Sequence, residues 1–235
     1  MRTSTAVILG LGIFLGLAAL GFQLASAAIE FKQFERTVTV KGLAEREVLA
    51  DIVIWPIQFI VADNDLQSLY RSIDAGTKSI TAFLEEKGIA AADVSLSAPA
   101  ITDKVAQQWG NDSAEYRYSA TQTVTVYSRD IERVRSVMGE LSALGKQGIV
   151  LQSGNYESQT EYLYTGLNDI KPEMIEEATR NAREAATEFA QDSESELGKI
   201  RQASQGQFSI SPRDKNNPHI MNVRVVSTVE YYLSD

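Results

Sequence analysis

Cysteine is absent from the 235-residue sequence, and histidine occurs only once. A chain without cysteine forms no disulfide, no thiolate zinc site, no iron–sulfur cluster and no cysteine nucleophile. The single histidine, His219, leaves little room for metal binding or acid–base chemistry based on imidazole. The sequence therefore predicts that the protein folds and works without a metal or a cofactor.

Basic residues are also in the minority, because 22 Lys and Arg stand against 31 Asp and Glu, which gives a formal net charge of −9. Nucleic-acid phosphates and anionic lipid headgroups attract basic surfaces. The charge thus argues against nucleic acid as a partner and against broad docking on anionic lipid. The 44% hydrophobic and 23% charged residues are typical of a folded protein that buries a core.

Recognisable catalytic and phosphate-binding motifs are missing as well. The sequence contains no G-x-S-x-G nucleophile elbow. Gly10–Gly12 lies in an apolar segment before any strand, so it cannot form a dinucleotide-binding loop. Asp63–Asp65 begins like a calcium loop, but Gln67 and Ser68 stand where a further ligand and a glycine are needed. The sequence predicts no catalytic residues and no enzymatic activity.

Residues 1–29 are predicted to be a membrane anchor or a signal segment. After the basic Arg2, an apolar run extends from Ala6 to Phe22 and continues from Leu24 to Ile29. A spanning helix needs about 20 apolar residues, whereas the apolar part of a signal peptide has about 7–15. The length of this run favours an uncleaved anchor.

A cleaved secretory signal is the alternative for the same segment. Ala25–Ala27 has the small-residue pattern that precedes signal cleavage, so cleavage near Ala27 would release a soluble protein. On either interpretation the linker at residues 30–36 and the domain at residues 37–235 are exported.

Alternating apolar residues predict a first strand at Thr37–Lys41 that turns at Gly42, and a long second strand at Val48–Ala62. Pro56 removes a ladder donor, which predicts a bulge or a locally unpaired edge in the second strand. Helices are expected after Asp65, Asp130 and Pro172. Further strands are expected at Val94–Ile101, Tyr116–Tyr127, Ile149–Tyr164, Lys199–Ile210 and Met221–Leu233.

This order of elements predicts an α+β fold. Adjacent strands between single helices favour antiparallel sheets packed with about three helices, rather than a doubly wound parallel sheet. The hairpin–helix unit recurs loosely at Thr37–Gly88 and Val94–Gly145. The apolar segment adds a helix at the N-terminus.

Four stretches of the sequence resemble the SIMPL-domain family of bacterial envelope proteins. They are Val38–Trp55, Tyr118–Val134, Glu176–Ala186 and Val223–Leu233. The resemblance implies an α+β domain exported across the inner membrane into the periplasm. It also implies a ring-like or channel-like homo-oligomer, and for some members a link to oxidative-stress tolerance. It brings no catalytic residues, because the family has no established active site.

Three sets of residues are candidates for chemistry or binding. His219 follows Asn-Asn-Pro and is predicted to be a solvated loop residue. Glu45, Glu47 and Asp51 are paired-carboxylate candidates, although a polar turn between strands is the simpler interpretation. The remaining set is an accumulation of tyrosines, suited to a groove, to a subunit interface or to ordinary sheet surface: Tyr156, Tyr162, Tyr164, Tyr231 and Tyr232.

Three functional hypotheses follow, and the first is preferred. The protein is a homo-oligomeric envelope scaffold, a periplasmic binding module for a peptide or glycan, or, least favoured, an enzyme. The expected partners are further copies of itself and, through residues 1–29, the membrane. The strands Tyr116–Tyr127 and Met221–Leu233 carry no edge-protecting proline, so they are predicted to be the exposed edges that pair between chains.

Overall fold

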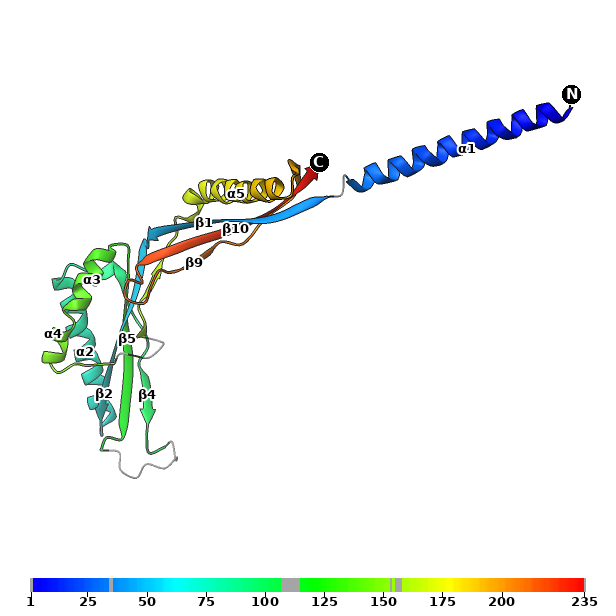
Figure 1. Ribbon diagram of the computed structural model, residues 1–235. Helices are drawn as coiled ribbons and strands as arrows, with labels where there is room; N and C mark the ends of the chain where they lie inside the picture. The colour runs from blue at the N-terminus through cyan, green and yellow to red at the C-terminus, as the bar shows by residue number, and fades with distance from the viewer. Residues whose placement is uncertain (1, 34–35, 107–114, 153, 155–157, 235) are drawn as a thin grey trace. The chain divides into compact units, whose positions relative to one another are not determined.

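The computed structural model describes residues 2–33, 36–106, 115–152, 154 and 158–234. It confirms the predicted α+β class, with helices packed on antiparallel sheets (Figure 1). Contacts between Cα atoms divide the chain into two compact units. The first unit comprises Met1–Arg46, Ile170–Ser209 and Arg224–Asp235, and the second comprises Glu47–Asp169 and Ile210–Val223.

The N-terminal segment forms the helix α1 (Arg2–Gln33). Its described side chains, from residue 11 to residue 26, are all exposed. No helix within the described residues is long and apolar enough to cross a membrane. The predicted helix is therefore confirmed, whereas the predicted membrane span gains no support.

The first unit contains a sheet in which β10 (Ile220–Ser234) lies between β1 (Thr37–Leu49) and β8 (Glu196–Gln205). The short strand β9 (Ser209–Pro212) also pairs with β10. One face of this sheet packs against α5 (Leu167–Asp192), which runs along β1 and β10 in Figure 1.

The helix α5 approaches the sheet closely because its buried face is small. Met174 and four alanines recur every fourth residue along that face: Ala178, Ala182, Ala186 and Ala190. Opposite them lies Gly42, where an added Cβ would stand 1.8 Å from the carbonyl oxygen of Ala178. Only glycine leaves room for this contact.

The turn predicted at Gly42 is therefore wrong. Gly42 lies inside β1, which continues to Leu49, and the chain turns at Ala50 and Asp51 instead. Glycine in a sequence signals either a turn or a close backbone approach. Here the second cause applies, because the helix backbone occupies the space of the missing side chain.

The second unit contains a larger sheet with the strand order β3-β5-β2-β6, in which β4 also pairs with β5 and β7 with β2. The bounds are β2 (Ile52–Asp63), β3 (Val94–Leu96), β4 (Ala100–Asp103), β5 (Tyr118–Ser128), β6 (Val150–Gln152) and β7 (Glu161–Leu163). Its helices are α2 (Leu66–Glu86), α3 (Ile131–Gly139), α4 (Ser142–Lys146) and the 3-10 turn η1 (Ala91–Asp93). The pairing of β2 with β5 is antiparallel and runs without interruption from Val53 to Asp63.

The predicted helix starts in this unit are confirmed. The Asp65 side chain accepts a hydrogen bond from the backbone N–H of Ser68, and that of Asp130 accepts one from Arg133. Both are the N-caps expected from the sequence. The helices bury large side chains against the sheet, among them Leu69, Ile80, Leu84 and Leu144.

Pro56 lies at a locally unpaired edge, which is one of its two predicted outcomes. On one side it stands opposite Thr125 of β5 in regular register. On the other side β7 pairs with Ile52–Ile54 and β6 with Gln58–Ile60. Within the described chain, the three residues from Trp55 to Ile57 have no strand partner on that edge.

The two strands predicted to be exposed edges are internal. In the second unit, β5 lies between β2 and the pair β3 and β4. In the sheet of the first unit, β10 lies between β1 and β8. The edge prediction was wrong because alternation in a sequence reports which face of a strand is buried, and contains no information about its hydrogen-bonded neighbours.

Candidate binding pocket

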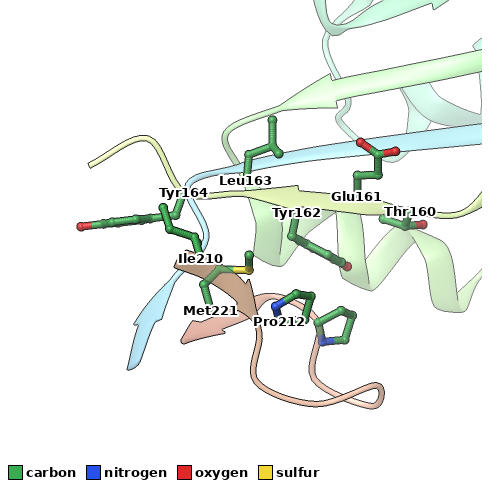
Figure 2. A pocket seen from close by; sticks show the side chains of 9 residues that line it. Thr160, Glu161, Tyr162, Leu163, Tyr164, Ile210, Pro212 and Met221 are labelled. Atoms are coloured by element: carbon green, nitrogen blue, oxygen red, sulfur yellow. The ribbon is translucent and has the colours of Figure 1, made fainter. Parts of the chain in front are cut away.

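The candidate site is a cavity of about 410 Å³ in the second unit. It lies beside β7, β9 and the start of β10 (Figure 2). Its lining residues are mostly apolar, aromatic or proline: Thr160, Glu161, Tyr162, Leu163, Tyr164, Ile210, Pro212, Pro218 and Met221.

Side-chain alternation along β7 decides which residues face the cavity. Figure 2 shows the Tyr162 side chain on the side of β7 where Pro212 and Met221 lie, whereas Leu163 and Glu161 point to the opposite side of the strand. Such alternation follows from the period of two in an extended strand. The inner wall is therefore apolar and uncharged, and the carboxylate of Glu161 stays outside it.

The β7 side of the cavity is fixed by Asp51. One carboxylate oxygen of Asp51 accepts hydrogen bonds from the backbone N–H and the hydroxyl of Thr165, both at 2.8 Å. The backbone N–H of Asp51 donates to the carbonyl of Leu163 at 2.8 Å. Asp51 thus holds the end of β7 in place from the turn between β1 and β2.

The opposite side is fixed by the turn between β9 and β10. One oxygen of Asp214 accepts hydrogen bonds from the backbone N–H groups of Asn216 and Asn217, both at 2.8 Å. The guanidinium of Arg213 donates to the other oxygen and lowers the pKa of Asp214 to about 2. Pro212 precedes this turn and Pro218 follows it, and both prolines line the cavity.

The ring of His219 lies 6.1 Å from that of the cavity residue Tyr162, measured between ring centroids. His219 is only 9% exposed, and its Nδ1 atom has no hydrogen-bond partner among the described residues. Burial lowers the pKa of the His219 imidazole and raises the pKa of the Tyr162 hydroxyl. Both groups are therefore neutral at pH 7.

The predicted solvated position of His219 is wrong. Its carbonyl accepts a hydrogen bond from the backbone N–H of Ala50 at 2.9 Å, which fixes the residue inside the second unit. The Asn-Asn-Pro stretch before it is typical of a loop, but nothing in that stretch shows that the loop folds back onto Ala50.

The predicted carboxylates do not converge on one site. Glu45 pairs with Arg224 at 3.1 Å and Glu47 with Arg213 at 3.4 Å. Asp51 binds Thr165 instead. Each group has a structural partner of its own, so the three do not act as paired carboxylates. The predicted polar turn holds only for Asp51, because Glu45 and Glu47 lie within β1. Across the described residues, no group of three or more His, Asp or Glu is arranged to hold a metal ion.

The tyrosines divide between different environments. Tyr162 and Tyr164 line the cavity, and the hydroxyl of Tyr164 donates to the carbonyl of Gly166 at 3.0 Å. Tyr231 is buried in the core of the first unit, and its neighbour Tyr232 is 40% exposed. Tyr156 lies outside the described residues.

The cavity could not be predicted from the sequence because its walls are far apart in the chain. Strand β7 and the β9–β10 turn are separated by all of α5 and β8. Tyr162 and Tyr164 belong to the tyrosine set that the sequence suggested for a groove. Ile210 and Met221, which line the cavity with them, resemble ordinary core residues in the sequence. A further sign in the sequence is the pair Pro212 and Pro218, which stand on either side of a polar turn and line the cavity.

Comparison with protein families gives one finding. Residues 38–230 match the family model SIMPL, described as a protein of unknown function (DUF541). Among curated proteins no match is found. The matched range includes all of the second unit and, of the first unit, Val38–Arg46, Ile170–Ser209 and Arg224–Glu230.

Proposed function

Since the chain belongs to the SIMPL family, we propose that it is a non-enzymatic, homo-oligomeric envelope protein that forms a scaffold or a ring-like assembly. The assembly forms through the edges of the sheet in the first unit. In this proposal the domain lies in the periplasm. A role in oxidative-stress tolerance is also proposed, on the family resemblance alone.

The observation that supports assembly is the length of the two outer strands. β1 has 13 residues and β8 has 10. In the described part of the chain, each of them pairs only with β10. An outer strand exposes a row of N–H and C=O groups that readily pair with another chain. Almost every residue of β8 is exposed, with only Leu197 half-buried.

Two ion pairs join neighbouring strands of this sheet. Glu45 of β1 pairs with Arg224 of β10, and Arg201 of β8 pairs with Glu230 of β10 at 2.8 Å. These ion pairs hold neighbouring strands of one chain together. The outer edges of β1 and β8 have no strand partner in the described chain, which favours contact between copies through these edges.

The directions of the strands indicate how copies would join. β8 runs antiparallel to β10. β1 does the same, because Arg36 at its start bonds Leu233 at the end of β10, and Glu45 pairs with Arg224 near the other end. β1 and β8 are thus parallel to each other. A head-to-tail contact of β8 with β1 of the next copy continues the sheet and closes into a ring when the rotation permits.

Export through the N-terminal segment completes the proposal. Large apolar side chains are exposed along α1: Leu11, Ile13, Phe14, Leu15, Leu17, Leu20, Phe22 and Leu24. Apolar surface of this extent on a helix needs an apolar environment or removal by cleavage. Mass spectrometry of the protein from cells decides between the two, because a mature N-terminus near Ala28 indicates cleavage.

Proline substitutions in β8 test the edge contact. The N–H groups of neighbouring residues in a strand point to opposite edges of that strand. Of the two variants Ala203→Pro and Ser204→Pro, one therefore removes an N–H group that bonds β10, and the other removes an N–H group that points outward. We expect the outward variant to remain folded by circular dichroism and to have a lower mass by light scattering. Gln207→Pro, which lies beyond the end of β8, is the matched control. Unchanged mass in both β8 variants would contradict the proposal.

The alternative function, a binding module for a peptide or glycan, needs a site that this chain forms by itself. The cavity beside Tyr162 is the part of the structure that favours it.

A further inference from the structure

We propose that the cavity beside β7 binds an extended peptide and takes up one bulky apolar side chain from it. The main chain of the peptide pairs with the outer edge of β7. The evidence for this proposal is that an apolar cavity lies next to a strand edge with no strand partner in the described chain. The proposal does not depend on the proposed oligomer.

The volume of the cavity suits one large side chain and its neighbouring backbone. Its 410 Å³ lies within the range of about 300–1,000 Å³ found for small-ligand sites. Ile210 and Met221 form an aliphatic wall, and the ring of Tyr162 lies alongside them (Figure 2). A leucine or phenylalanine side chain would exchange water for contacts with all three.

The polar groups of the cavity are too few for a sugar. A glycan site needs several donors and acceptors that converge on ring hydroxyls, because a buried hydroxyl without a partner is costly. The polar side chains lining this cavity are Thr160, Glu161 and the two tyrosine hydroxyls. Glu161 points away, and the hydroxyl of Tyr164 already donates to Gly166. An apolar side chain is the occupant that this wall fits.

The edge of β7 supplies the backbone partner. β7 pairs with Ile52–Ile54 of β2, and the structure describes no strand on its other side. Addition of a peptide strand to such an edge supplies affinity through main-chain hydrogen bonds, while a pocket for alternate side chains supplies specificity. Because Tyr162 faces the cavity from this same strand, the peptide backbone and its side chain meet one continuous surface.

The walls are held in position before any ligand arrives. Asp51 fixes the end of β7 through Thr165, and Asp214 closes the turn that carries Pro212 and Pro218. A site that needs no rearrangement loses less conformational entropy on binding. The wall is also uncharged, so a negatively charged side chain at the anchoring position is excluded by its desolvation cost.

The test uses full-length protein and fluorescein-labelled peptides of the form Thr-Thr-X-Thr-Thr-Lys, in which X is Leu, Phe, Ala or Asp. Fluorescence anisotropy measures the dissociation constants. Burial of the anchoring side chain predicts that the Leu and Phe peptides bind at least about tenfold more tightly than the Ala peptide. The Asp peptide is expected to bind most weakly.

Two variants fill the cavity from opposite walls, namely Ile210→Trp on β9 and Thr160→Trp beside β7. Both are expected to weaken binding of the Leu peptide at least tenfold, and thermal melting identifies a variant that fails to fold. Leu96→Ala is the matched control, since Leu96 is 52% exposed on β3 and is not among the residues that line the cavity. We expect this control to bind as the unaltered protein does.

Competition separates the parts of the proposal. N-acetyl-leucine amide has the side chain without the extended backbone, so it should compete at least tenfold more weakly than the Leu peptide. Equal competition overturns the strand pairing, and tight binding of N-acetylglucosamine at the same site overturns the peptide assignment. Equal affinity for all four peptides, or no binding, overturns the whole proposal. Particle mass measured on the same samples tests the oligomer separately.

Discussion

The two units of this protein form cores of different kinds. The second unit buries large side chains, and Phe59, Leu69, Ile80, Leu84 and Leu144 are each at most 1% exposed. The first unit buries mainly alanine from α5 against Gly42 and a few larger residues of β1 and β10. Since burial stabilises in proportion to apolar area, each residue of the first core contributes less.

This difference explains why assembly is assigned to the first unit. Its core depends on a close approach of backbone to backbone, and its sheet has two long strands, β1 and β8, whose outer edges have no strand partner in the described chain. Pairing between copies would add hydrogen bonds where side-chain burial is smallest. The second unit has a larger core and, by contrast, the candidate pocket.

The largest effect is expected from Phe59→Ala in the second unit. Phe59 is 1% exposed and packs against Gly76, so its removal leaves a cavity that costs about 3–5 kcal/mol of unfolding free energy. Urea unfolding followed by Trp55 fluorescence, in a Trp109→Phe background, reports on this unit. Phe189→Ala, at a side chain 60% exposed on α5, is the control and should change stability by less than about 0.5 kcal/mol. A loss below about 1 kcal/mol for Phe59→Ala would refute the comparison.

A smaller and more local effect is expected from Gly42→Ala in the first unit. The added Cβ would overlap the carbonyl oxygen of Ala178, and overpacking of this kind costs about 1–3 kcal/mol. Hydrogen exchange should show faster exchange in α5 while the Trp55 transition is unchanged. Gly139→Ala is the matched control, because nothing lies within 4 Å of its added Cβ. Unchanged exchange in α5 would show that helix and sheet are less closely packed than the structure indicates.

The smallest effect concerns pH and the buried His219. Burial lowers the pKa of its imidazole in the folded state below the ordinary value of 6.5. As pH decreases, the His219 imidazole therefore binds a proton in the unfolded chain before it does so in the folded protein. The free energy of unfolding falls as pH decreases from about 6.5 to the lower pKa of the folded state, and His219 causes no further loss below that pKa. His219→Phe should remove this slope between pH 8 and pH 5 in thermal melting. The carboxyl of Asp214, with its folded pKa of about 2, titrates in a separate and more acidic window. A slope that survives the substitution would assign the titration to another group.

Much of the fold was predictable from local patterns. The caps Asp65 and Asp130, the alanine face of α5 and the internal faces of β5 and β10 all follow from side-chain chemistry and spacing. These features depend on residues that are close in the chain, which is why periodicity detects them.

Features that depend on distant segments were not predictable in the same way. The role of Gly42 needs α5, and the burial of His219 needs Ala50. The outer positions of β1 and β8 depend on the whole strand order, which alternation does not encode. The pocket combines β7 with the β9–β10 turn for the same reason.

The mass of the particle in solution tests the central claim most directly. Light scattering on the full-length protein, and on the chain from Arg36 onward, should give a mass of more than two copies for both at micromolar concentration. Agreement between the two would show that the assembly forms without the N-terminal segment, as contact through the sheet edges requires. A monomeric mass for the chain from Arg36 onward would contradict the account and leave peptide binding as the preferred function.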